Sequence, residues 1–155
     1  MNKLSVAIIA ILLAIIAAMG WFFFLRGSVT PADDGRTAIL LKPSDRNVLL
    51  TEMRGFLEAI QAIIAATEEG DMKTVRETAK KVGTVNMAEI PPSLMRALPA
   101  EFRSMGFDTH AQFRKLAEDV AAGKGRDHIY KALAEVMNNC VTCHAGYRAD
   151  PDTGQ

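Results

Sequence analysis

The chain has few of the residues that mark several common protein classes. Its 155 residues include two cysteines, one tryptophan and two tyrosines, so it is not a disulfide-dense scaffold. Its 18 lysines and arginines equal its 18 aspartates and glutamates, which excludes the basic excess of a nucleic-acid-binding domain. It contains no internal repeat, low-complexity tract or strand-like alternation of apolar and polar residues. We therefore expect one helical domain that binds no nucleic acid.

Long hydrophobic runs are also missing, with one exception near the N-terminus. Residues 4–25 contain 20 apolar side chains among 22 positions. The apolar share of the whole chain is 49%. Without this run it falls to about 42%, an ordinary value for a globular domain. The hydrophobic excess therefore belongs to one segment, and residues 27–155 are slightly acidic, with 16 basic and 18 acidic residues.

Residues 4–25 are predicted to form a transmembrane helix. As a helix the run spans roughly 33 Å, enough to cross the hydrocarbon core of a bilayer. The alternatives are a buried core helix and a cleaved signal peptide. The apolar region of a signal peptide is usually about 7 to 15 residues long and ends at a small-residue cleavage site. No clean A-x-A pattern follows here, and the aromatic block Trp21 to Phe24 suits a membrane interface. We assign residues 1–26 to this anchor, with an uncleaved signal as the variant interpretation.

Four amphipathic helices are predicted beyond the anchor. Residues 27–43 mix Gly, Pro, Asp and Thr and suit a linker. Apolar residues then recur at helical spacing within 44–148, which predicts an all-α fold, an antiparallel four-helix bundle. Residues 149–155 form a C-terminal tail. The capping residues expected at the first three helix starts are Ser44 or Asp45, Asp71, and Thr109 with Gln112, and the fourth helix is expected to begin near Asp127.

One short motif carries the chemistry. Residues 140–144 read Cys-Val-Thr-Cys-His, the C-x-x-C-H pattern that attaches a c-type haem. Positions i, i+3 and i+4 share one face of a helix. Both thiols can therefore add to the vinyl groups of one porphyrin while the imidazole reaches its iron. We expect one covalently attached haem c, held by Cys140 and Cys143, with His144 as an iron ligand.

The two cysteines have three alternative uses: a redox dithiol, half of a zinc site, or a structural pair. A redox dithiol normally stands at a helix start after a strand, whereas Cys140 lies well inside the predicted fourth helix. A zinc site needs further ligands. Only His110 and His128 remain, and both are expected at the surface near helix starts.

The motif also predicts the compartment. Haem is attached to such a motif outside the cytoplasm, so the bundle is expected on the periplasmic side of a bacterial cytoplasmic membrane. The anchor would then be a single-pass span with its N-terminus inside. The flanking charges, Lys3 and Arg26, favour this topology only slightly.

The position of the motif gives a resemblance to a known family. A C-x-x-C-H near the C-terminus, inside the last helix of a predicted bundle, resembles class II c-type cytochromes, the cytochrome c-prime family and its low-spin relatives. The likeness covers residues 44–148 and not the anchor. It includes the C-x-x-C-H-x-x-Y-R run over 140–148 and Met53-Arg54-Gly55 leading to Ala62-Ile63. It implies a haem packed inside the bundle, with a first-helix residue opposite the histidine.

The resemblance places Met53 at that first-helix position, as a second iron ligand. A His/Met pair raises the reduction potential of a haem, as in the six-coordinate electron carriers of the family. A non-coordinating residue there gives five-coordinate members, which bind small gases. Met53 also fits the apolar stripe of its helix, so the alternative is a plain core residue.

Residues just after the motif have both haem-binding and structural interpretations. Arg148 could pair with a haem propionate, or it could favour a helix C-terminus. Tyr147 could hydrogen-bond a propionate, or it could close the end of the bundle. A basic run on the predicted second helix could dock a redox partner or form a solvated face: Lys73, Arg76, Lys80 and Lys81.

These features predict an electron carrier and no enzyme activity. The residues three and four positions from Met53 on its predicted helix are apolar and supply no general base or nucleophile: Leu49, Leu50, Phe56 and Leu57. We expect a membrane-anchored monohaem cytochrome that passes single electrons between periplasmic or membrane-bound redox proteins. The alternatives are a five-coordinate protein that binds nitric oxide or carbon monoxide, and a haem-bearing accessory subunit of a membrane redox complex. The resemblance also implies that a homodimer can form.

Overall fold

The structure is a computed structural model that describes residues 2–154, apart from the side chains of Phe23 and Phe24. The described chain is mostly helical, as predicted, and it also carries one small sheet. Its elements in order are α1 (Lys3–Gly20), a π-helical turn (Trp21–Leu25), β1 (Val29–Pro31), β2 (Thr37–Leu41), α2 (Pro43–Glu69), α3 (Met72–Val82), a 3₁₀ turn (Met87–Glu89), α4 (Pro92–Ala97), α5 (Ala100–Ala121), α6 (Arg126–Gly146) and β3 (Tyr147–Pro151).

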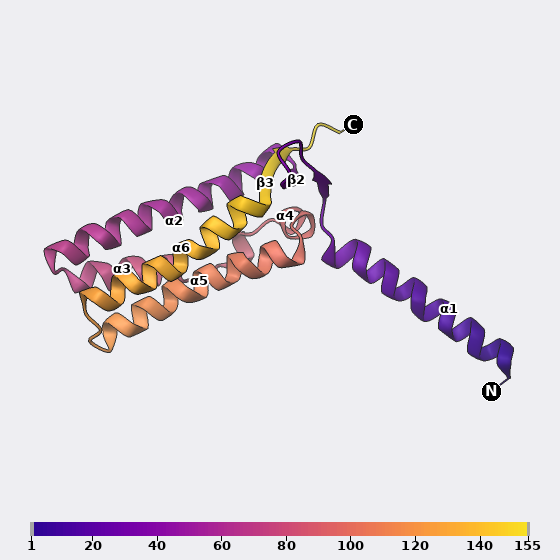
Figure 1. The fold of residues 1–155 in the computed structure, drawn as a ribbon, viewed down its shortest axis with the longest axis horizontal. Helices are drawn as coiled ribbons and strands as arrows, with labels where there is room; N and C mark the ends of the chain where they lie inside the picture. The colour runs from indigo at the N-terminus through magenta and orange to yellow at the C-terminus, as the bar shows by residue number, and fades with distance from the viewer. Residues whose placement is uncertain (1, 155) are drawn as a thin grey trace.

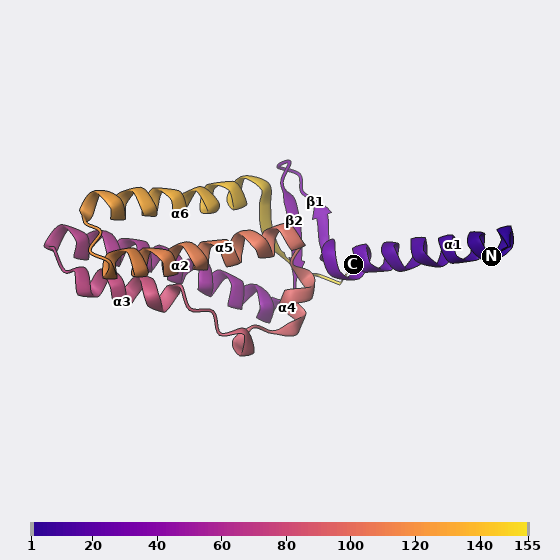
Figure 2. The same cartoon turned by 90° about the horizontal axis from the view of Figure 1, so that it is seen from below.

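Helices α2, α3, α5 and α6 lie side by side and form the body of the molecule (Figure 1, Figure 2). Their apolar faces meet in one core, where Ile63, Phe113 and Val136 have no exposed surface. Phe56 stacks on Phe113 with ring centroids 5.9 Å apart. This mid-body core consists of Ala59, Ile60, Ile63, Ala66, Val75, Ala79, Phe113, Leu116, Ala117, Val120, Ile129, Leu133 and Val136.

The long helix α2 starts and ends through backbone geometry. It begins at Pro43, because the fixed φ of proline suits the first turn of a helix. The predicted side-chain cap by Ser44 or Asp45 is therefore wrong, and Lys42 occupies the cap position without a side-chain hydrogen bond. At the other end Gly70 adopts a left-handed conformation with φ of 74°, which releases the chain from the helix.

The starts of α3 and α6 agree with the sequence pattern. The Asp71 side chain caps α3 by accepting a hydrogen bond from the backbone amide of Thr74 at 3.0 Å. Helix α6 begins at Arg126, one residue before the predicted Asp127. Gly123 and Gly125 lie in the turn that separates α5 from α6.

Helix α5 begins well before the predicted residue. It starts at Ala100, after Pro99 in an extended conformation, so the predicted capping box of Thr109 and Gln112 is wrong. Thr109 lies inside the helix, where its hydroxyl donates to the carbonyl of Met105 at 2.8 Å. A threonine can bond the preceding turn in this way and remain helical, so a cap-like pattern alone does not place a helix start.

The expectation that the chain has no strands is also wrong. The segment 27–43, expected as a linker, contains β1 and β2, and the expected tail contributes part of β3. Strand β2 lies in the centre, antiparallel to β1 and parallel to β3. Its register places Thr37 beside Tyr147. The strands have three to five residues each, too few for a visible alternation of apolar and polar residues, and β3 lies far along the chain from its partner β2.

The sheet closes one end of the body with a second core. Ile39 and Leu41 of β2 have no exposed surface. This sheet-end core joins β2 to the start of α2, to α4 and to the start of α5, and Met53, Cys143 and Tyr147 pack against it. Its buried members are Ile39, Leu41, Leu49, Leu94, Leu98 and Phe102.

The N-terminal helix α1 is long and apolar enough to span a membrane by length and composition. Its 18 residues have a mean hydropathy of 2.4, and none is buried in the structure. Trp21 and Phe22, which follow it, are also exposed. The helix projects away from the body at the end that carries the sheet (Figure 1, Figure 2).

Candidate functional site

The C-x-x-C-H motif occupies the last turns of α6, at the end of the body that the sheet closes. Cys140 and Cys143 are partly buried free thiols, and His144 is exposed. Cys143 packs against the sheet-end core. The Sγ of Cys140 lies 3.9 Å from the carbonyl oxygen of Val136. The helix therefore presents both thiols and the imidazole along one face, as their spacing predicts.

Both thiols lie in surroundings that favour the protonated form. Burial raises the pKa of Cys140 and Cys143, and the neighbouring Cys140 raises that of Cys143 further. Redox-active dithiols contain a cysteine with a lowered pKa, so these surroundings differ from those of a redox pair. Among residues 2–154, no group of three or more His, Cys, Asp or Glu side chains is arranged to hold a metal ion.

An open cleft of about 220 Å³ lies beside the motif. Five of the six residues predicted to bind the cofactor line it, although they come from α2, α6 and β3. Cys140 lies one helical turn before Cys143 on the same face of α6. The lining residues are Arg36, Arg46, Leu50, Met53, Phe102, Cys143, His144, Tyr147, Arg148 and Ala149.

Met53 reaches the cleft from α2. It lines the cleft beside Leu50 and also packs against the sheet-end core. The packing agrees with a core role and the cleft position agrees with a ligand role, so both interpretations stay open for its thioether. The structure brings Met53 and His144 to one cleft although they are far apart in the chain.

Tyr147 and Arg148 belong to β3, which begins directly after α6 ends at Gly146. The Tyr147 hydroxyl donates to Glu101 at 3.3 Å, and its ring meets Phe102 edge-on. These contacts agree with a closing role for Tyr147. The Arg148 guanidinium already pairs with three carboxylates at 2.9–3.3 Å, those of Asp33, Asp34 and Asp150.

Two further arginines line the cleft, and the sequence analysis did not single them out. Arg36 donates to the backbone carbonyl of His144 at 3.3 Å and also binds Asp34. Arg46 donates through Nε to the carbonyl of Ala149 at 2.9 Å, and no carboxylate among the described residues pairs with it. Arg46 lies two helical turns before Met53 on α2, a spacing that could have predicted it. No local pattern could have predicted Arg36.

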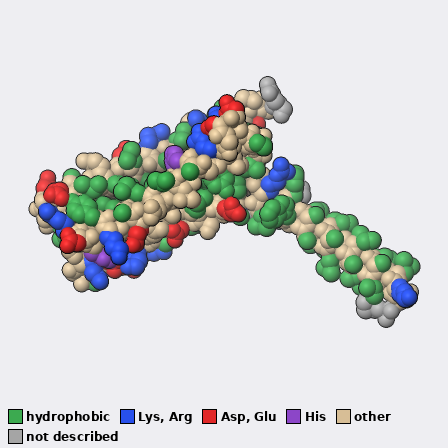
Figure 3. Space-filling view, in the orientation of Figure 1, with side chains coloured by type: hydrophobic (Ala, Val, Ile, Leu, Met, Phe, Trp, Pro, Cys, Tyr) green, Lys and Arg blue, Asp and Glu red, His purple; other side chains and the backbone are tan. Residues whose placement is uncertain are grey.

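Exposed apolar side chains continue beyond the cleft along α2 and α6. Leu57, one turn after Met53, is 69% exposed, and Val141, inside the motif, is also 69% exposed. Met137, one turn before Val141, is 41% exposed. Figure 3 shows hydrophobic side chains gathered over these two helices on the face turned to the viewer. Such exposed apolar surface beside a cleft is a common mark of a ligand-binding surface.

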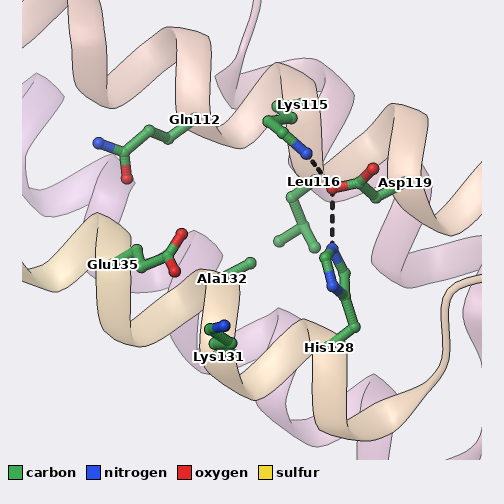
Figure 4. A pocket seen from close by; sticks show the side chains of 8 residues that line it. All are labelled: Gln112, Lys115, Leu116, Asp119, His128, Lys131, Ala132 and Glu135. Atoms are coloured by element: carbon green, nitrogen blue, oxygen red, sulfur yellow. Dashed lines mark hydrogen bonds and ion pairs between the residues drawn. The ribbon is translucent and has the colours of Figure 1, made fainter.

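A second, smaller cavity of about 120 Å³ lies between α5 and α6, and none of the residues predicted to bind the cofactor lines it. Lys115 and His128 both point to Asp119 there, at 2.6 and 2.8 Å (Figure 4). His128 is thus a partly exposed ion-pair residue. His110, expected at the surface, is buried inside α5, because α5 starts earlier than predicted and carries His110 into the body.

Comparisons with known proteins identify no relative of this chain. No family model matches the sequence, and no curated protein or solved structure is significantly similar to it. The function must therefore be argued from the motif and from the cleft that the fold builds around it.

Proposed function

We propose that this chain is a membrane-anchored, periplasmic, monohaem c-type cytochrome that carries single electrons. The observation that supports the proposal is the cleft. It brings Cys143 and His144 of the C-x-x-C-H motif together with Met53 from a distant part of the chain. A chance C-x-x-C-H on a helix surface would have no reason to share a cleft with a thioether.

Each residue of the set has a defined role. Cys140 and Cys143 would hold the haem through thioether bonds to its two vinyl groups, and His144 would ligate its iron. Met53 would supply the second protein ligand to the iron, and a His/Met pair raises the reduction potential. When bound, the haem supplies an iron that exchanges one electron between the ferric and ferrous forms. No general base or nucleophile is needed, so the protein is a carrier and not an enzyme.

The apolar surroundings fit such a group. The cleft of about 220 Å³ is smaller than the roughly 300–1,000 Å³ of pockets that enclose a whole ligand. The exposed side chains of Leu57, Met137 and Val141 extend the apolar surface beside it. Covering these side chains with a porphyrin would remove them from water, at about 25 cal/mol per Å² of apolar area.

The cleft also offers positive charge for the propionates of a haem. Arg36, Arg46 and Arg148 line it. Arg148 and Arg36 are already paired with carboxylates. We assign the propionate contact first to Arg46, whose guanidinium uses only Nε, for the Ala149 carbonyl. Arginine suits this task because its planar fork bonds carboxylates in pairs.

The arrangement of the helices supports the class II interpretation. We interpret α2, α3, α5 and α6 as an antiparallel four-helix bundle, with the haem-binding motif on the last helix as in cytochrome c-prime. The haem would lie beside α2 and α6, where the exposed apolar side chains gather. The sheet and the anchor are additions to the pattern of that family.

The proposed location is the bacterial cytoplasmic membrane. Helix α1 would be the single span, and the body would lie on the periplasmic side, since haem is added to this motif outside the cytoplasm. The partners would be periplasmic or membrane-bound redox proteins.

The test is to express the full chain with a periplasmic haem-attachment system and to record absorption spectra in both oxidation states. We expect covalent haem, lost in Cys140→Ala with Cys143→Ala, and a low-spin spectrum with the far-red thioether-to-ferric band. Met53→Ala should remove that band. Met137→Ala is the matched control, because Met137 also lies beside the motif but on its own helix.

The alternative functions predict different spectra. A high-spin ferrous spectrum with ready carbon monoxide binding would contradict the electron-carrier assignment and would favour the five-coordinate gas-binding protein. Absence of covalent haem in a folded, membrane-inserted chain would overturn the cytochrome proposal altogether.

A further inference from the structure

The connection between the membrane span and the body is very short. The π-helical turn that follows α1 ends at Leu25 and β1 begins at Val29, so only residues 26–28 lie between them. Three residues reach at most about 11 Å when fully extended. The linker predicted over 27–43 would have reached roughly 60 Å. The sheet thus removes nearly all of the freedom that a tether would give.

This connection is also packed against the body. Gly27 has φ of +69°, and a Cβ at this position would lie 2.5 Å from the carbonyl oxygen of Ala97 and 2.7 Å from the nitrogen of Pro99. Only glycine permits this approach of two backbones. The next residue, Ser28, donates its amide to the carbonyl of Ala97 at 2.8 Å. The chain is therefore clamped to the α4–α5 junction directly after the span.

The clamp leads to the motif through the sheet. β1 pairs with β2, and β2 pairs with β3, whose first residue Tyr147 follows His144 closely. Arg36, which precedes β2, donates to the carbonyls of His144 and Tyr147. The end of the span and the end of α6 are thus joined by consecutive hydrogen-bonded strands. The opposite end of the body, at the α5–α6 turn, lies roughly 40 Å away along α2.

We propose that this clamp holds the cleft end of the body against the membrane surface, so that the site exchanges electrons with a redox protein embedded in the same membrane. This inference rests on the proposed function and narrows its partners. A clamped body presents its cleft at the level of the headgroups, whereas a long tether would let it turn toward soluble partners.

The position of the body can be measured with a pair of labels. Arg96→Cys on α4 lies beside the clamp, and Lys124→Cys lies at the far end; both residues are exposed and basic. In the holoprotein Cys140 and Cys143 are occupied, so only the new thiol takes a fluorescent label. With a quencher on the lipid headgroups of nanodiscs, the label at 96 should be quenched several-fold more strongly than the label at 124.

Three variants separate the effect of the clamp from a general loss of folding. Gly27→Val introduces a side chain into the backbone contact and should abolish most of the difference between the two labels. Gly35→Ala is the matched control: Gly35 also has positive φ, but nothing lies within 4 Å of a Cβ there. Inserting about twelve Gly and Ser residues after Gly27, a chain that averages roughly 20 Å end to end, should act like Gly27→Val.

Electron exchange at the membrane surface is measured separately, as the rate at which a lipid-bound oxidant oxidises the ferrous protein. Ferricenium attached to a phospholipid headgroup takes one electron from the ferrous protein, giving ferrocene and the ferric form, with no bond or proton change. Oxidation by this lipid-bound probe should slow several-fold in the insertion variant. Oxidation by water-soluble ferricenium should not change.

The outcomes distinguish the two proposals. If haem is attached but both labels are quenched equally, or if the insertion leaves the lipid-bound reaction unchanged, the membrane-held arrangement is overturned and the cytochrome stands. If no haem is attached, the absorption spectrum shows this directly. The proposed function is then overturned, and the proposed exchange with a membrane-embedded redox protein is overturned with it.

Discussion

The two apolar cores of the body differ in composition and in what surrounds them. The mid-body core consists of helix residues alone, and Phe113, Ile129 and Val136 within it are fully buried. The sheet-end core combines a strand with parts of three helices, and three residues of the proposed haem site pack against it: Met53, Cys143 and Tyr147. None of the residues predicted to bind a cofactor belongs to the first core. The second core contacts Met53, Cys143 and Tyr147 beside the cleft, so the proposed site lies at the sheet end and apart from the helical core.

The strongest test of this comparison removes the largest side chain of the mid-body core. Phe113 is fully buried and stacks on Phe56, so Phe113→Ala should lower the free energy of unfolding by about 3–5 kcal/mol. Urea unfolding of the full chain in detergent, followed by circular dichroism, measures the loss. Leu57→Ala is the control, since Leu57 is 69% exposed and should change stability by less than about 0.5 kcal/mol. Equal losses would contradict the assignment of the core.

A substitution in the sheet-end core should destabilise a smaller part of the molecule. Ile39→Ala removes a fully buried side chain from β2 and should cost about 2–4 kcal/mol. Because β2 carries both β1 and β3, the amides of Leu41 and Ala149 should exchange with solvent much faster, while those of α3 keep their protection. Hydrogen exchange with mass spectrometry measures both regions in one experiment. A uniform loss of protection over the whole body would show that the two cores form one cooperative unit.

The same division explains what could be predicted from the sequence. The mid-body core follows from the helical periodicity of apolar residues within 44–148, and Ile60, Ile63 and Leu133 are among the residues that this spacing buries. The sheet-end core could not be predicted, because Thr37 pairs with Tyr147 across most of the chain. Strands of three to five residues give too few positions for a visible alternation.

The candidate site shows the same limit. The motif identified Cys140, Cys143 and His144 from local spacing, and Met53 came from a resemblance to a family. Arg36 joins the cleft only because β2 lies beside β3. Helix α5 starts early, directly after Pro99. His110 is therefore buried within the body, although it was expected at the surface.

His110 lies where α3, α5 and α2 meet, and it should give the mid-body region a pH dependence. Its Nδ1 donates to the carbonyl of Val82 at 2.6 Å, and its Nε2 lies 3.1 Å from Glu52. Burial is the largest influence and opposes the charged form, but the hydrogen bonds to Glu52 and to Val82 together raise the pKa of His110 above its usual value. Both ring nitrogens face acceptors, which favours the doubly protonated ring.

The sign of the effect follows from the raised pKa. The stability that it contributes is fully present below the unfolded pKa of about 6.5 and is lost as pH rises through the higher folded pKa. His110→Gln should therefore cost about 1–3 kcal/mol at low pH and less under alkaline conditions. Urea unfolding at both pH values measures the difference. His128→Gln should cost less throughout, since its ion pair with Asp119 is partly exposed. A loss for His110→Gln that grows with pH would contradict the charged assignment.

The smallest expected effect concerns the charges that tie the β1–β2 turn to β3. The hydrogen bond from the Arg36 side chain, with smaller help from Arg148, lowers the pKa of Asp34 from its usual 3.8 to about 2. A lowered pKa contributes stability above the unfolded value, and this contribution is lost as pH falls toward the folded value. Asp34→Asn should therefore speed hydrogen exchange in β3 slightly near neutral pH, and progressively less as the pH falls toward 2. Asp33→Asn is the control, because Asp33 is 92% exposed and meets only Arg148. Added salt should shrink the Asp34 effect, since exposed charges are screened. An effect that salt leaves unchanged would mean that packing in the turn, and not charge, fixes β3 beside the motif.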